Sequence, residues 1–182
     1  MPSLEALLAM PRAGLAAALA AGHAIDPAAL DDSAYEGTSL GLPGWIERLT
    51  WKKFQKVFHR DPATGELRGW NVRLAQNGVG APCVPLVEAG ERVTFGHYRV
   101  APMEGYTPPK PCGPGLMLDY KFGARGALDP LGALRDPIVA LEPGSVEHLL
   151  GWSYLDVAGV PVSTPSYFAL RRVGQLDHVV AR

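Results

Sequence analysis

Short aromatic or branched segments, separated by Gly and Pro, make up the last third of the chain. They run from Gly115 to Phe122, from Leu149 to Tyr154 and from Tyr167 to Arg172. Segments of this length and composition, bounded by turn residues, are typical of neighbouring antiparallel strands. No catalytic signature overlaps them, so the sequence says more about architecture than about chemistry.

The same periodicity of two begins near Tyr35 and continues towards the end of the chain. Residues 61–65, Asp-Pro-Ala-Thr-Gly, predict a hairpin turn between two strands, and Ala158-Gly159 predicts another. About eight or nine strands at this spacing indicate a sandwich or a barrel. Besides the strand at Tyr35, the expected strands cover residues 49–58, 67–75, 93–98, 116–122, 137–141, 146–157 and 166–173.

A barrel is favoured over a sandwich because several strands carry bulky side chains on both faces. Phe95 lies close to Tyr98, and Trp152 close to Leu149, whereas a sheet with one face in water would show one polar face. Closure also leaves no unpaired edge strand. The predicted fold class is mainly β, a single antiparallel β-barrel of about eight or nine strands over residues 35–182. A barrel of this size encloses room for one small ligand.

A short N-terminal helical segment, residues 1–34, is expected to precede the barrel as a lid within the same globular domain. Ser3 can cap a first helix, and an alanine-rich second helix stops at Gly22. Asp26-Pro27 then begins a further short turn, with Asp as the N-cap. The narrow apolar stripe of this segment predicts docking against the barrel mouth or a sheet face.

Composition disfavours several classes of function. A formal net charge of −1 over 182 residues provides no overall field that would attract nucleic acid. No apolar run approaches the roughly 18 residues needed to cross a bilayer. Cys83 and Cys112 provide neither a zinc spacing nor a disulfide framework. We therefore expect a cytoplasmic monomer or homodimer that binds neither nucleic acid nor a membrane.

Five short motifs resemble those of the bacterial GXWXG domains and, more broadly, calycin-type small barrels such as lipocalins and nitrobindin. In GXWXG domains an opening strand leads to a tryptophan–lysine, a tyrosine–aspartate and a leucine–glycine strand, and the closing strand ends in arginines. The resemblance spans roughly residues 30–173 and implies a barrel with an interior ligand site. The counterparts are Tyr35-Glu36-Gly37-Thr38, Trp51-Lys52-Lys53-Phe54, Asp119-Tyr120, Leu149-Leu150-Gly151 and Phe168-Ala169-Leu170-Arg171-Arg172.

Asp119 and His97 are the candidate catalytic residues, because strand alternation allows both to face a cavity. Burial would raise the pKa of Asp119 and suit it to acid–base work. The alternatives are that Asp119 pairs with Lys121 on the outer face and that His97 is a hydrogen-bonded structural residue. The candidate ligand-binding residues are Trp51, Phe54, Trp70, Phe95, Tyr98, Tyr120, Trp152 and Tyr154.

Residues 48–73 form the most basic part of the chain, with aromatic side chains interleaved. Such a ribbon is compatible with single-stranded nucleic acid, with a solvated hairpin face, or with capture of an anionic head group near the barrel rim. Nucleic acid is the least favoured of the three, because the rest of the chain is net negative and carries no known RNA-binding or zinc pattern.

The sequence predicts a protein that binds a small hydrophobic ligand, lipid-like or a secondary metabolite, in a barrel cavity without a cofactor or metal. One alternative is a cofactor-independent cyclase, isomerase or hydratase of secondary metabolism. Another is a nitrobindin-like haem barrel, in which His148 or His178 would supply the iron ligand. The common hydrolase and nucleotide-binding signatures are absent, so whether the protein is an enzyme stays open.

Overall fold

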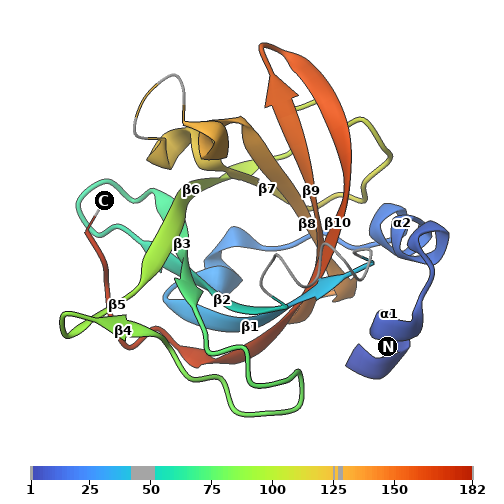
Figure 1. Cartoon of the computed structure of the whole chain (residues 1–182). Helices are drawn as coiled ribbons and strands as arrows, with labels where there is room; N and C mark the ends of the chain where they lie inside the picture. Colours follow the sequence, from blue (N-terminus) through green and yellow to red (C-terminus); the bar gives the residue numbers. More distant parts are fainter. Residues whose placement is uncertain (1, 42–51, 125, 127–128, 182) are drawn as a thin grey trace.

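The computed structural model describes residues 2–41, 52–124, 126 and 129–181, and within them eight antiparallel strands close into a barrel (Figure 1). The strand order around the barrel is β1-β10-β9-β8-β7-β6-β3-β2, so the first and last strands of the chain pair with each other. The predicted mainly β fold and barrel are confirmed. The barrel strands are β1 Ser33–Leu40, β2 Lys53–Arg60, β3 Leu67–Arg73, β6 Thr94–Pro102, β7 Leu116–Asp119, β8 Leu134–Glu142, β9 Ser145–Val157 and β10 Val160–Gln175. A separate two-stranded ribbon consists of β4 Val87–Glu88 and β5 Glu91–Arg92.

Both predicted hairpin turns are confirmed. Between β2 and β3, the Asp61 side chain accepts a hydrogen bond from the Ala63 amide, and Gly65 has a φ of 73°. Between β9 and β10, Ala158 and Gly159 have φ values of 54° and 85°. Two successive positive φ values define the turn that matches the twist of a two-residue hairpin.

The strand expected over residues 116–122 is shorter, because β7 ends at Asp119. The Asp119 carboxylate accepts a hydrogen bond from the Lys121 amide and begins a 3₁₀ turn, η2 Tyr120–Gly123. A side chain that bonds to the backbone two residues further on offers the chain an alternative to the sheet ladder. A second such turn, η3 Pro130–Ala133, leads into β8.

The N-terminal helices begin and end as expected but lie beside the barrel, not over its mouth. The Ser3 side chain caps α1 Leu4–Ala9, which is followed by α2 Arg12–Ala20. Leu15 and Leu19 of α2 belong to an apolar cluster on the outer faces of β8 and β9 (Figure 1). The predicted helical segment was expected to dock against either the barrel mouth or a sheet face, and the structure shows docking on a sheet face.

One end of the barrel interior is closed from within by the segment that follows α2. Asp26 caps the 3₁₀ turn η1 Pro27–Leu30, as predicted. Ile25 and Leu30 are buried in the interior cluster, where they lie with Tyr35 of β1 and Phe58 of β2. This end is therefore packed with apolar side chains.

The interior cluster takes side chains from all eight barrel strands, whereas two other clusters cover the outside of the wall. One outer cluster lies under α1 and α2. In the other, Leu176 and Val180 of the C-terminal tail pack over Val57 and Val72. Among the described residues, no helix is long and apolar enough to cross a membrane. The strand members of the interior cluster are Tyr35, Phe58, Leu67, Tyr98, Leu116, Leu118, Ile138, Ala140, Leu149, Phe168 and Leu170, and Tyr120 follows β7.

Candidate functional site

Three of the predicted ligand-binding residues lie inside the barrel. Tyr98 and Tyr120 are buried in the interior cluster, and Phe54 packs against it. Phe95 is half-buried on β6, with its ring centroid 5.9 Å from the Arg73 guanidinium. These residues lie on the barrel-inward face or at its rim, as the sequence indicates.

Three other predicted ligand-binding residues lie on the outside of the wall. Trp70 belongs to the cluster under the C-terminal tail, and Trp152 and Tyr154 belong to the cluster under the helices. Bulky residues occur on both faces of these strands because separate segments cover the outside, not because both faces line a cavity. Trp51 lies outside the described residues.

The two predicted catalytic residues also lie on the outside. Asp119 accepts hydrogen bonds from the Tyr106 hydroxyl at 2.9 Å and from the Lys121 amide, and its carboxylate is 3.1 Å from the Arg135 guanidinium. The His97 ring lies beside Trp70, with the ring centroids 5.9 Å apart. The structure therefore agrees with the alternative in which Asp119 lies on the outer face of the barrel. Its cationic partner, however, is Arg135 and not Lys121.

The polar groups inside the barrel are instead centred on Lys56, which has only 2% of its surface exposed. Alternation along β2 places Lys56 on the same face as Phe54 and Phe58, and therefore inside. Its ammonium donates hydrogen bonds to Asn71 Oδ1 at 2.9 Å and Tyr120 Oη at 2.5 Å. The third acceptor is Asp136 Oδ2 of β8, at 3.3 Å.

The four side chains form one continuous network, which we call the interior polar cluster: Lys56, Asn71, Tyr120 and Asp136. The Tyr120 hydroxyl donates to Asp136 Oδ2 at 2.9 Å. Asn71 is oriented by its amide nitrogen, which donates to the Gly96 carbonyl at 3.2 Å. The second carboxylate oxygen, Asp136 Oδ1, is buried and has no hydrogen-bond partner among the described residues. One strong acceptor in the barrel interior is therefore left open.

Aromatic rings surround the ammonium of Lys56 on several sides. Its Nζ lies 5.0–5.6 Å from the ring centroids of Phe54, Tyr98, Tyr120 and Phe168. Glycines make room for two of these rings, because a Cβ on Gly37 would lie 2.3 Å from the Phe54 ring and one on Gly151 would lie 2.2 Å from the Phe168 ring. Cation–π attraction of this kind partly compensates for lost hydration of the charge.

Burial also shifts the ionisation of the cluster. Loss of hydration lowers the pKa of Lys56 from its ordinary value, and the Asp136 carboxylate partly offsets this effect. Burial raises the pKa of Tyr120 well above 10, and the negative charge of Asp136 acts in the same direction. The arrangement therefore joins an amine that is easier to deprotonate, a phenol that stays protonated and a carboxylate with a free oxygen.

The alternation of β2 is the sequence signal that could have identified Lys56. The composition of residues 48–73 indicates only a basic, aromatic segment with three possible roles, whereas the alternation that places Phe54 and Phe58 inside places Lys56 there too. No comparable signal identifies Asp136. It lies on β8, which is not a neighbour of β2, and it contacts Lys56 only because the closed barrel brings the two strands to face each other.

The haem alternative gains no support from the histidines proposed for it. His148 lies on β9 beside a pocket under α1, and His178 lies in the C-terminal tail, 3.8 Å from Glu91. His148 shares the outer face of the wall with Arg171, its partner in register, and His178 lies beyond the end of β10, so neither is placed to hold a haem iron within the barrel. Among the described residues, no group of three or more His, Cys, Asp or Glu side chains could hold a metal ion.

No protein-family model and no curated protein matches the sequence. The closed barrel of eight antiparallel strands is compatible with the calycin-like fold that the five motifs resemble. The more specific likeness to GXWXG domains stays a prediction.

Proposed function

We propose that the protein binds a small, mostly apolar molecule in the barrel interior and holds it by a hydroxyl or N–H group. Asp136 Oδ1 carries this proposal, because it is the one acceptor of the interior polar cluster that has no partner within the described part of the chain. A buried acceptor without a donor costs about 1–3 kcal/mol, which a donor on the ligand would recover. The surrounding rings would contact the apolar part of such a ligand.

The cost of the interior polar cluster supports the same conclusion. Replacing a buried ion pair by apolar side chains is often neutral or stabilising. The closed end of the same interior shows that this chain can fill the barrel with apolar side chains. A costly charged pair among aromatic rings is therefore better explained by binding than by folding.

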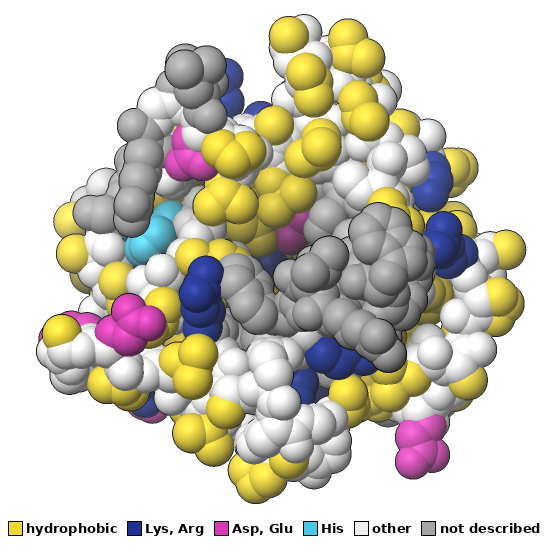
Figure 2. Space-filling model, in the orientation of Figure 1, with side chains coloured by type: hydrophobic (Ala, Val, Ile, Leu, Met, Phe, Trp, Pro, Cys, Tyr) yellow, Lys and Arg dark blue, Asp and Glu magenta, His cyan; other side chains and the backbone are white. Residues whose placement is uncertain are grey.

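The molecular surface is consistent with access to this cluster from the end opposite Ile25 and Leu30. On the face in Figure 2 the surface is hollowed, hydrophobic side chains border the hollow, and acidic and basic atoms lie deep within it. Two of the rings beside Lys56, the half-buried Phe54 and the buried Phe168, mark this end of the barrel. They lie further than Phe58 from the end that Ile25 and Leu30 close. A ligand that enters here would meet the polar cluster before the apolar packing.

The test compares two matched fluorescent probes, 1-naphthol and 1-methoxynaphthalene, which differ in the hydroxyl donor. We expect the wild-type protein to bind 1-naphthol about tenfold more tightly, the equivalent of one hydrogen bond. In the double variant Lys56→Met/Asp136→Leu this preference should disappear. Lys53→Met is the control, because Lys53 is also a buried lysine of β2 but contacts the loop outside the wall.

Three outcomes would contradict the proposal. They are equal affinities for the two probes in the wild-type protein, a preference that survives in the double variant, and no binding of either probe at millimolar concentration. Loss of the preference in Lys53→Met alone would show that the effect is not specific to the interior.

A second candidate function is proton transfer on such a ligand, as in a cofactor-independent isomerase or cyclase. It is favoured by the continuous hydrogen bonding of Lys56, Tyr120 and Asp136, which places a carboxylate base beside two proton donors. The test is deuterium exchange at the acidic carbon of 2-tetralone, followed by NMR. Catalysis should fall by roughly 10²–10⁴-fold in Asp136→Asn. No acceleration over buffer would exclude this function for the probe and leave the binding function standing.

A further inference from the structure

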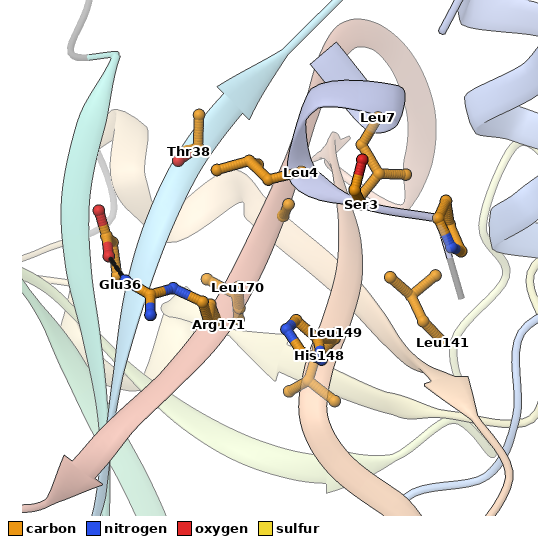
Figure 3. Close-up of a pocket in the computed structure, with 12 residues that line it drawn as sticks. Ser3, Leu4, Leu7, Glu36, Thr38, Leu141, His148, Leu149, Leu170 and Arg171 are labelled. Atoms are coloured by element: carbon orange, nitrogen blue, oxygen red, sulfur yellow. Dashed lines mark hydrogen bonds and ion pairs between the residues drawn. The ribbon is translucent and has the colours of Figure 1, made fainter. Parts of the chain in front are cut away.

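A pocket lies outside the barrel wall, between α1 and the strands β1, β8, β9 and β10 (Figure 3). Its volume is about 260 Å³. On the helix side the pocket is lined by Leu4 and Leu7 of α1. On the side of the barrel wall its lining includes Leu141 and Ala169. An apolar cavity of about 150 Å³ is enough to hold benzene, so this pocket has room for a somewhat larger apolar group.

Three polar side chains form a row on the wall of this pocket. Glu36 of β1 is paired in register with Arg171 of β10, and Arg171 is paired with His148 of β9. Side chains at directly opposite positions of neighbouring strands lie on the same face of the sheet. Figure 3 shows Glu36 and Arg171 joined, with the His148 ring close to the apolar side chains.

The row is incompletely satisfied. Arg171 Nη2 donates to Glu36 Oε2 at 2.5 Å, which uses one of the five N–H groups of the guanidinium. His148 Nδ1 is buried and has no hydrogen-bond partner among the described residues. The Arg171 side chain is 58% exposed, so its remaining donors are accessible. An anionic group between Arg171 and His148 would accept hydrogen bonds from the guanidinium and from His148 Nδ1 in the tautomer that carries its proton on Nδ1.

We propose that this pocket binds the carboxylate of a short-chain or medium-chain amphipathic acid. The carboxylate lies between Arg171 and His148, and the chain lies between α1 and the wall, against Leu4, Leu7 and Leu141. Arginine suits this role because its planar donors match a carboxylate. Glu36 competes with the ligand for Arg171 and limits the affinity. The site is separate from the interior polar cluster and does not depend on the function proposed for it.

The test is calorimetric titration with octanoate, with octan-1-ol as the uncharged control of equal chain length. We expect octanoate to bind more tightly than octan-1-ol. Arg171→Gln should weaken octanoate binding roughly tenfold, because a charge-assisted hydrogen bond is lost. Glu36→Gln should strengthen octanoate binding, because it removes the competing carboxylate. Neither change should alter the binding of octan-1-ol by more than about twofold.

Two further variants locate the binding. Leu4→Trp, which fills the pocket from the helix side, should abolish binding of both compounds. The double variant Lys56→Met/Asp136→Leu should bind octanoate as the wild-type protein does. The proposal is overturned if octanoate binds no more tightly than octan-1-ol, or if its affinity is unchanged in both Arg171→Gln and Glu36→Gln. Loss of octanoate binding in the interior double variant would place the acid in the barrel and also overturn it.

Discussion

Lys53 and Lys56 are both buried on β2, but they lie on opposite faces of the barrel wall and have different kinds of partner. Outside, Lys53 donates to Asn77 Oδ1 at 2.9 Å and to the Ala81 and Pro82 carbonyls at 2.7 and 3.3 Å. These acceptors are neutral and come from one loop. Inside, Lys56 contacts groups from three separate segments, one of them a carboxylate with a free oxygen.

The difference between the two lysines agrees with a structural role for Lys53 and with the binding role that we propose for Lys56. The contacts of Lys53 fix the loop at residues 77–82 to the wall, and they leave no open position for another molecule. The contacts of Lys56 form a charged cluster in which, among the described residues, the acceptor Asp136 Oδ1 has no partner. We infer that the fold does not need this cluster. Equal burial of the same residue type therefore does not imply an equal role.

The largest expected effect is on stability when each lysine is replaced by Met. Lys56→Met leaves the Asp136 carboxylate buried without its cation, and should lower the free energy of unfolding by about 3–5 kcal/mol. Adding Asp136→Leu should recover most of this loss. Lys53→Met leaves only neutral acceptors unsatisfied and should cost about 1–3 kcal/mol. Urea denaturation at pH 7 measures all three. A double variant no more stable than Lys56→Met would contradict the view that the fold does not need the cluster.

A smaller effect distinguishes Tyr98 from Tyr120, whose ring centroids are 5.3 Å apart. The Tyr98 hydroxyl donates to the Val57 carbonyl at 2.9 Å, away from the polar cluster. Replacement of either tyrosine by Phe should cost about 1 kcal/mol of stability. Only Tyr120→Phe should change the preference for 1-naphthol over 1-methoxynaphthalene. It should raise this preference, because Asp136 loses the hydrogen bond from the Tyr120 hydroxyl and the donor of the probe replaces it. An equal change in the Tyr98→Phe variant would contradict this assignment.

The smallest effect is a pH dependence at alkaline pH. The pKa of Lys56 is lowered in the folded state, so between that value and the unfolded value near 10.4 the unfolded state binds more protons. Stability conferred by this group therefore rises with pH across that window. Urea denaturation at several pH values gives the free energy of unfolding of the wild-type protein and of the double variant Lys56→Met/Asp136→Leu. The difference between the two free energies isolates the contribution of the pair, because titrations common to both proteins cancel. A difference that falls with rising pH would show that the pKa of Lys56 is not lowered.

The fold was predictable because alternation, turn residues and helix caps are local signals. Asp61 to Gly65, Ala158-Gly159, Ser3 and Asp26 each fix a turn or a cap with residues that are close in sequence. The end of β7 was missed because the Asp119 side chain competes with the sheet ladder at that point.

The site was less predictable because it depends on what covers each face of the wall. Trp70 and Trp152 are as apolar as interior residues, but they lie under the C-terminal tail and the helices. Lys56 was obscured by its basic neighbours in sequence, and Asp136 approaches it only across the closed barrel. Local patterns indicate which residues share a face, but they do not indicate which face meets solvent.

The pairing of β1 with β10 has a consequence for how the protein is made. Ser33 is in register with Gln175, so the barrel closes through a contact between segments that are far apart in the sequence. Contacts so distant in sequence form slowly, because loop-closure entropy is lost before they contribute. During synthesis β1 has one unpaired edge until β10 has left the ribosome. Phe168, whose ring packs against the Lys56 ammonium, lies on that same strand, so the interior site is complete only after β10 has been made.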